Sequence, residues 1–300
     1  MRIILLTLTF AFLPACSEKP VSRSGPVGAP VVAAVNYPLA TFSEILASGN
    51  VEVLFPELEG DPAFWKLSDE EIARFQSANL ILRNGATYAK WTKTVSLPES
   101  TQIDTSKAFS GDFIAEETSV SHTHGDGDSH THAGTASTTW LDFQQAIWQL
   151  EAVRDALIEL APSDEKGIRD RFNKLADEMD KWHTQMREIG NTLNDRPILA
   201  SHPVYQYLAR RYDLNIKYLH WEPDTELSGE NLEELKELIS RHPASVMLWE
   251  QTPPSESIEK LKSLGIDSVV FDPCGNRPDT GDFLTVMQEN IKRLDAVSGN

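Results

Sequence analysis

Residues 164–191 read "DEKGIRDRFNKLADEMDKWHTQMREIGN" and predict one long amphipathic helix. Apolar residues recur along this stretch in alternating steps of four and three, the spacing that lines up side chains on one face of an α-helix. The apolar face contains Ile168, Phe172, Leu175, Met179, Trp182, Met186 and Ile189. Because the pattern lasts for only about three heptads, we favour a helix that packs on its own domains over a coiled coil. Trp182 and the methionines are then core residues.

Strand-like and helix-like segments alternate on both sides of this helix. Before it, such patterns occupy residues 30–46, 51–57, 68–85 and 140–162. After it, strands at 197–201, 215–221, 245–251 and 267–273 alternate with helices at 203–213, 231–243, 257–265 and 282–297. This alternation is typical of parallel α/β sheets. We predict an α/β fold with two lobes, each a small parallel sheet flanked by helices, joined by one long rigid helix.

The predicted organisation has five parts. They are a signal peptide (1–15), a lipidated tether (16–30), an N-terminal lobe with a His-rich loop (31–163), the linking helix (164–192) and a C-terminal lobe (193–300). Arg2 and the apolar run 3–13 are typical of a signal peptide, and the run is too short to span a membrane as a helix. "LPAC" resembles a bacterial lipobox, in which Cys16 is acylated and begins the mature chain. We therefore expect a lipid-anchored protein on the periplasmic or cell-surface side of a bacterial membrane; an ordinary signal peptide is the alternative.

The composition is that of a soluble and strongly acidic protein. The chain has 300 residues, with 45 Asp and Glu against 27 Lys and Arg, and a net charge of -18. This charge argues against nucleic acid and anionic lipid surfaces as partners. It suits a cationic ligand, although solubility alone also explains an acidic surface. If Cys16 carries lipid, only Cys274 remains, so no intramolecular disulfide forms and Cys274 is expected to be buried and inert.

Four potential metal ligands follow predicted strands of the C-terminal lobe. His202 comes directly after one strand, and Asp272 ends another. His220 and Glu250 lie near the ends of the other two. Open parallel sheets bind ligands at the carboxyl ends of their strands, and imidazole nitrogen with carboxylate oxygen suits a borderline divalent metal. The structural alternatives are a helix cap for His202, a turn for Asp272 and ordinary hydrogen bonding for the other two.

Four short segments resemble the metal-binding solute-binding proteins of zinc and manganese ABC transporters (cluster A-I). They are "GDPAFW" (60–65), "WLD" (140–142), "PILASHPVYQYLARRYDL" (197–214) and "VVFDPCGN" (269–276), within a resemblance that runs over residues 31–297. The resemblance implies an extracytoplasmic protein, not an enzyme, that binds Zn(II) and delivers it to an ABC permease. It also implies that His202 and Asp272 are ligands, because they match two ligand positions of the family.

Two further ligand positions of that family lack histidine here, and they correspond to Ala63 and Thr138. The stretch "HTHGDGDSHTH" (122–132) ends six residues before Thr138. Its histidines are His122, His124, His130 and His132. Six extended residues span roughly 20 Å, so the loop can reach the vacant position. We predict that the His-rich loop supplies the missing zinc ligands; the alternatives are an accessory metal collector and no metal role.

Three functions remain open at this point. The first is a monomeric, lipid-anchored zinc-binding protein that serves an ABC permease. The second is a zinc-buffering or chaperone lipoprotein of the same fold without a dedicated permease, which Ser17 slightly favours because a serine after Cys16 is typical of outer-membrane sorting. The third is a metal-dependent hydrolase, which needs an open metal position and a general base. No His-Glu-x-x-His motif supports the hydrolase.

Overall fold

The computed structural model describes most of the chain from residue 28 onward. The described residues are 28–58, 60, 62–115, 121–123, 129–131, 134–221, 226–227 and 229–299. The predicted signal peptide, Cys16 and the loop residues His124 and His132 lie outside them. Within the described residues, no helix is both long enough and apolar enough to cross a membrane.

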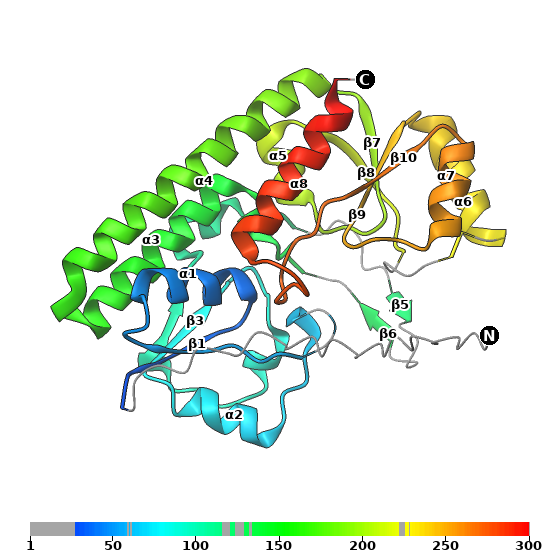
Figure 1. The fold of residues 1–300 in the computed structure, drawn as a ribbon. Helices are drawn as coiled ribbons and strands as arrows, with labels where there is room; N and C mark the ends of the chain where they lie inside the picture. The colour runs from blue at the N-terminus through cyan, green and yellow to red at the C-terminus, as the bar shows by residue number, and fades with distance from the viewer. Residues whose placement is uncertain are drawn as a thin grey trace, which may run out of the picture.

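Two four-stranded parallel sheets form the framework of the protein (Figure 1). The first has the order β2-β1-β3-β4 and the second the order β10-β9-β7-β8. The strands are β1 (Val31–Ala34), β2 (Glu52–Leu54), β3 (Leu80–Arg83), β4 (Gln102–Asp104), β7 (Pro197–Ala200), β8 (Asn215–Tyr218), β9 (Val246–Trp249) and β10 (Asp267–Val270). The predicted α/β fold with two parallel sheets is confirmed. Strand β4 was not predicted, because its three residues contain a single apolar side chain, Ile103.

Eight α-helices flank these sheets in the described part of the chain. They are α1 (Tyr37–Ala47), α2 (Asp69–Gln76), α3 (Phe143–Leu160), α4 (Glu165–Leu193), α5 (Gln206–Tyr212), α6 (Gly229–Arg241), α7 (Ser255–Ser263) and α8 (Phe283–Ser298). We call the first sheet with α1, α2 and α3 the first lobe, and the second sheet with α5 to α8 the second lobe. Helix α2 begins with a capping box, in which the Glu71 amide donates to Ser68 Oγ at 3.3 Å and the Ser68 amide donates to Glu71 Oε2 at 2.7 Å.

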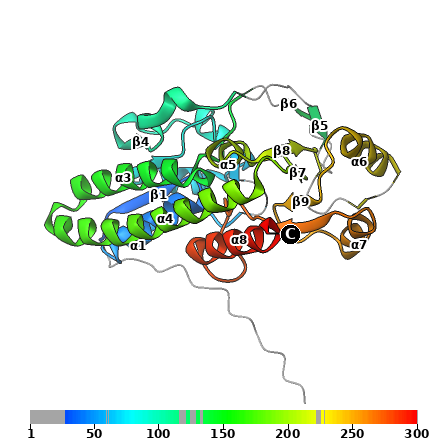
Figure 2. The ribbon, with the colours of Figure 1, turned by 90° about the horizontal axis from the view of Figure 1, so that it is seen from above.

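Helix α4 joins the lobes and contacts both of them (Figures 1 and 2). Its 29 residues make a rod about 43 Å long, since an α-helix rises about 1.5 Å per residue. All seven residues of the predicted apolar face are buried. They pack against α1 and α3 of the first lobe and against α5 and α8 of the second. The prediction of a helix that packs on its own domains is therefore confirmed.

One apolar core runs through both lobes. Ile81 of β3 and Ile198 of β7 belong to the same buried cluster, and Met179 of α4 lies in it as well. A second cluster, which includes Trp221 and Trp249, lies within the second lobe. The lobes are thus packed against each other and against α4, so the carboxyl ends of the two sheets are fixed in position relative to each other.

The predicted His-rich loop contains a short antiparallel pair of strands. Strand β5 (Ser121–Thr123) pairs with β6 (Ser129–Thr131), and the backbone register places His122 opposite His130. In both views these two strands lie on the side of the second lobe, near α6 (Figures 1 and 2). The backbone of the first and third loop histidines is therefore carried toward the lobe that holds His202.

Candidate metal centre

The four candidate ligands of the second lobe lie along one edge of its sheet. His202 follows β7 by two residues, Asp272 follows β10 by two, His220 follows β8 by two and Glu250 follows β9 directly. The strand order therefore gives the row Asp272, Glu250, His202, His220. His220 is exposed, whereas the other three are partly buried. Strand β9 separates β10 from β7, so the backbones beside Asp272 and His202 are about 10 Å apart.

The carboxylate of Asp272 is held by its own loop, and the Asp272 backbone is held by α8. Its Oδ1 accepts a hydrogen bond of 2.6 Å from the Cys274 amide. The Asp272 amide donates to Asn290 Oδ1 at 3.0 Å, and the Asn290 side chain donates to the Asp272 carbonyl at 2.6 Å. Burial raises the pKa of Asp272, while the Cys274 hydrogen bond and the charge of Arg293 act in the opposite direction. A cation would relieve the cost of burying this carboxylate.

Tyr205 lies near two carboxylates at this edge of the sheet. Its fully buried hydroxyl donates to the Phe271 carbonyl at 2.8 Å. The pKa of Tyr205 is raised well above its usual value, first by burial and then by the nearby carboxylates of Glu250 and Asp272. Both carboxylates therefore lie near the Tyr205 hydroxyl, at the edge of the sheet where the candidate ligands follow the strands.

The first-lobe positions Ala63 and Thr138 are both buried. Ala63 lies in a 3-10 turn, η1 (Pro62–Phe64), and is 5% exposed; Thr138 is 8% exposed. Thr138 Oγ1 donates to the Val204 carbonyl at 2.5 Å. Pro62, the residue before Ala63, lies close to Gly275 of the segment that follows Asp272, since a Cβ atom added to this glycine would lie 3.9 Å from Pro62 Cδ. Alanine has no ligand atom, and the threonine hydroxyl is engaged by backbone, so neither position supplies a metal ligand.

The segment that follows Asp272 crosses to the first lobe. Trp140 Nε1 donates to the Pro273 carbonyl at 2.7 Å, and the Tyr37 amide donates to the Gly275 carbonyl at 2.9 Å. Both donors belong to the first lobe, so Asp272 lies where the two lobes meet. Ligand sites occur preferentially at such boundaries between lobes.

The described residues do not by themselves form a metal site. Among them, no group of three or more His, Cys, Asp or Glu side chains is arranged to hold a metal ion. His124 and His132 lie outside the described residues, and for His122 and His130 only the backbone is described. Ligation by His202, Asp272 and the four loop histidines therefore stays a prediction.

Three tryptophans and one cysteine are packed in the interior. Trp65, Trp91 and Trp249 are at most 7% exposed. Cys274 is 2% exposed, as expected, and burial is the main cause that raises its pKa. A thiol with a raised pKa stays protonated, which makes it a poor nucleophile and a poor metal ligand.

A buried ion pair between the lobes was not predicted. Asp142 is fully buried, and each of its carboxylate oxygens lies 2.7 Å from Arg211 Nε. Asp142 also caps α3 by accepting from the amides of Gln144 and Gln145 at 3.1 and 3.2 Å. Burial raises the pKa of Asp142, and Arg211 opposes that rise. An aspartate before a helix is a recognisable cap, but its arginine partner 69 positions away leaves no local pattern.

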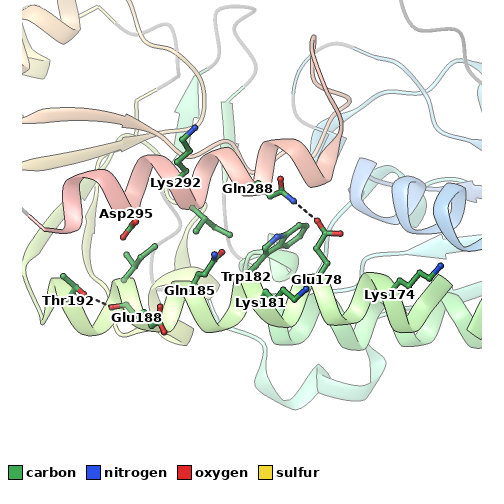
Figure 3. A pocket seen from close by; sticks show the side chains of 12 residues that line it. Lys174, Glu178, Lys181, Trp182, Gln185, Glu188, Thr192, Gln288, Lys292 and Asp295 are labelled. Atoms are coloured by element: carbon green, nitrogen blue, oxygen red, sulfur yellow. Dashed lines mark hydrogen bonds between the residues drawn. The ribbon is translucent and has the colours of Figure 1, made fainter. Parts of the chain in front are cut away.

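A groove of 870 Å³ lies between α4 and α8 (Figure 3). Its lining is mostly polar, and Gln288 donates to Glu178 across it at 2.6 Å. All of its lining residues come from these two helices. Because none of them lies at a strand end of either sheet, the groove is separate from the candidate metal centre.

The chain matches known proteins along most of its length. Residues 31–297 match the family described as "Zinc-uptake complex component A periplasmic". The manganese ABC transporter substrate-binding lipoprotein ScaA of Streptococcus gordonii is 22% identical over 311 aligned positions, which cover 97% of this chain and 96% of ScaA. A "Putative metal-binding protein" of Chlamydia trachomatis is 24% identical over 136 residues, which cover 45% of this chain and about half (49%) of the relative.

The fold is also that of a solved zinc-bound protein. The Zn(II)-bound ZnuA-like domain of Streptococcus pneumoniae AdcA has a TM-score of 0.74 and 18% identity, covering 91% of this chain and 100% of that domain. At this identity the likeness concerns the fold alone. Together with the match over residues 31–297, it confirms the resemblance drawn from the four sequence segments. This chain belongs to the ZnuA family, the metal-binding solute-binding proteins of zinc and manganese ABC transporters.

Proposed function

We propose that the protein is a lipid-anchored solute-binding protein that captures Zn(II) as cargo outside the cytoplasm and delivers it to an ABC permease. It acts as a monomer and performs no chemical reaction on its cargo. The observation that carries this proposal is the placement of His202 and Asp272 at the carboxyl ends of β7 and β10, where the lobes meet. Zinc takes imidazole nitrogen and carboxylate oxygen together, whereas carboxylate and water suit manganese.

The rest of the coordination sphere comes, in this proposal, from the His-rich loop. A tight zinc site needs three or four protein ligands, and the second lobe offers His202 and Asp272. Ala63 cannot ligate and Thr138 is bonded to the Val204 carbonyl. The loop ends six residues before Thr138, so its imidazoles can complete the site from the side on which the first lobe has no ligand.

The purified mature protein should bind one Zn(II) tightly and further zinc more weakly, with manganese bound less well than zinc. The reason is the mixture of one carboxylate with several imidazoles. Isothermal titration calorimetry with each metal measures both affinities. The same titration at pH 5.5 should show weaker zinc binding, because protons compete for imidazoles, whose usual pKa is about 6.5, and for Asp272, whose pKa is raised. Zinc binding no tighter than about micromolar would contradict the proposed function.

Replacing Cys16 with alanine should release the protein from the membrane into the soluble fraction of the cell envelope. The physical reason is that residues 3–13 form an apolar run too short to act as a stable membrane anchor, so the attachment depends on the acylated thiol. Detergent phase partitioning of Cys16→Ala beside the parent protein measures the change. Partitioning of the variant into the detergent phase to the same extent as the parent would rule out lipidation at this residue.

A further inference from the structure

Residues 273–277, which we call the strap, connect β10 to α8 and contact the first lobe on the way. In Figure 1 this coil passes beside α1, to which it is hydrogen-bonded. The Trp140 indole donates to the Pro273 carbonyl at 2.7 Å, and Asn276 Nδ2 donates to the Gly60 carbonyl at 2.6 Å. The strap is therefore bonded to the first lobe near both of its ends.

The strap also completes the N-terminal cap of α1. The first amides of a helix have no acceptor within the helix itself. Asn36 Oδ1 accepts from the Leu39 amide at 3.2 Å, and Pro38 has no amide proton to donate. The Tyr37 amide donates to the Gly275 carbonyl at 2.9 Å. One carbonyl of the second lobe thus serves as part of the cap of a first-lobe helix.

Close packing and backbone strain meet in the middle of the strap. A Cβ atom added to Gly275 would lie 3.2 Å from the Tyr88 hydroxyl oxygen and 3.7 Å from Trp140 Cζ2, so only glycine fits here without displacing a ring. The preceding Cys274 has φ 55°, a left-handed conformation that is unfavourable for a residue with a Cβ atom. The Asp272 carboxylate holds this turn by accepting from the Cys274 amide at 2.6 Å.

The last residue of the strap, Arg277, is held by charge. Its Nη2 donates to Glu44 Oε1 at 3.4 Å, and its Nε lies 3.1 Å from Glu57 Oε1. Its guanidinium lies 4.9 Å from the ring centroid of Tyr37. The Arg277 side chain is 23% exposed, and those of Glu44 and Glu57 are 42% and 49% exposed. Water can replace such partly exposed partners at low cost, so this end of the strap can be released.

We infer that residues 273–277 are a releasable strap, which detaches from the first lobe as a unit while the two lobes stay packed together. The strap is held mainly by hydrogen bonds and ion pairs and contains a strained turn. The lobes also meet through the apolar core that contains Ile81, Met179 and Ile198. Segments with few apolar contacts open at a lower free energy than the core. Since the strap begins directly after Asp272, its release lets this carboxylate move relative to the first lobe.

The substitution Arg277→Met tests the inference in metal-free protein kept in a chelator. In a Cys16→Ala background, Cys274 is the only cysteine. Because Cys274 is 2% exposed, a maleimide reacts with it only when the strap is released. We expect this reaction to become about tenfold faster, because two ion pairs and one cation–π contact are lost, each worth up to about fivefold. Amide hydrogen exchange at Tyr37 should accelerate similarly, while that of the central strands β1 and β7 stays unchanged.

Arg154→Met is the matched control. Arg154 lies 2.8 Å from Asp155, its guanidinium lies 4.3 Å from the ring centroid of Phe172, and its side chain is 18% exposed. It therefore makes the same two kinds of contact as Arg277, but with residues of α3 and α4 and not with the strap. This control should leave the maleimide reaction of Cys274 unchanged.

The double variant Glu44→Gln/Glu57→Gln removes the same ion pairs from the first-lobe side and should also accelerate the maleimide reaction. An unchanged reaction in Arg277→Met overturns the inference. Exchange in β1 and β7 that accelerates as much as exchange at Tyr37 overturns it as well, because the whole fold would then be opening. No zinc is titrated in these experiments, so their outcome does not depend on the proposed function.

Discussion

Deleting residues 122–132 should abolish the tight zinc site and not only the weaker binding, with a loss of affinity of more than about 100-fold. The reason is the number of ligands. Loss of a residue that merely orients a zinc ligand already costs about 10- to 100-fold, and the deletion removes ligands themselves from a set in which the second lobe offers His202 and Asp272. Calorimetric titration of the deletion variant with zinc measures the effect. An affinity equal to that of the parent would show that the loop is only a collector.

Three further variants test the same ligand set, and the first of them also controls for the shortened chain. Replacing His122, His124, His130 and His132 together by asparagine keeps the length and should reproduce the loss. His202→Ala should cause a comparable loss, because both halves of one coordination sphere are needed. Ala63→His in the deletion background should recover part of the affinity, since residue 63 lies beside the proline that approaches Gly275. Restoration by this histidine would show that the first lobe still presents a ligand position to the cleft.

Replacing Arg211 with methionine should lower the free energy of unfolding by about 3 kcal/mol at pH 7. Methionine keeps much of the packing but leaves the fully buried Asp142 carboxylate without its counter-charge, and breaking such a pair typically costs about 3–5 kcal/mol. We take the lower figure because the Arg211 side chain is 31% exposed. Urea unfolding followed by circular dichroism measures the difference between variant and parent.

The pH dependence of this loss has a defined sign. Burial raises the pKa of Asp142 in the folded protein, and the pKa rises further when Arg211 no longer opposes it. A carboxyl group with a raised pKa binds a proton more readily in the folded than in the unfolded state, so lowering the pH through that pKa stabilises the fold. The deficit of Arg211→Met should therefore shrink between pH 7 and pH 5. Asp142→Asn/Arg211→Met should recover much of the lost stability, and a deficit that grows toward pH 5 would contradict this account.

The sequence predicts those parts of the fold that depend on local periodicity. The apolar face of α4, the alternation of strands and helices, and the Ser68–Glu71 capping box all follow from residues close together in the chain. Strand β4 cannot be predicted in this way, because it is only three residues long and lies at the edge of the sheet, where it pairs with β3. Its existence depends on a neighbouring strand and not on its own pattern.

The candidate site, too, can be predicted from the sequence only in part. A rule about strand ends yields His202, Asp272, His220 and Glu250 as candidates. The resemblance to the family then selects His202 and Asp272 among them as the predicted ligands. The contacts between lobes cannot be predicted from the sequence in this way. Tyr207 bonds the Ile114 amide although the two residues are 93 positions apart, and Arg211 bonds Asp142 although they are 69 positions apart. A tyrosine or an arginine on a short helix has many possible partners, and only the packed arrangement of α3, α4 and α5 selects one of them.

The apolar face of α4 has a consequence for how the protein is made. Synthesis proceeds from the N-terminus, so β1 to β4 and helices α1 to α3 exist before α4 has left the ribosome. Buried residues of these elements share one cluster with α4 and with β7, β9 and α8. A nascent chain that ends near residue 163 therefore exposes apolar surface on α1 and α3 and is prone to associate with other chains. Secretion through a membrane keeps the chain unfolded until it has crossed, so the first lobe would not fold while α4 is still missing.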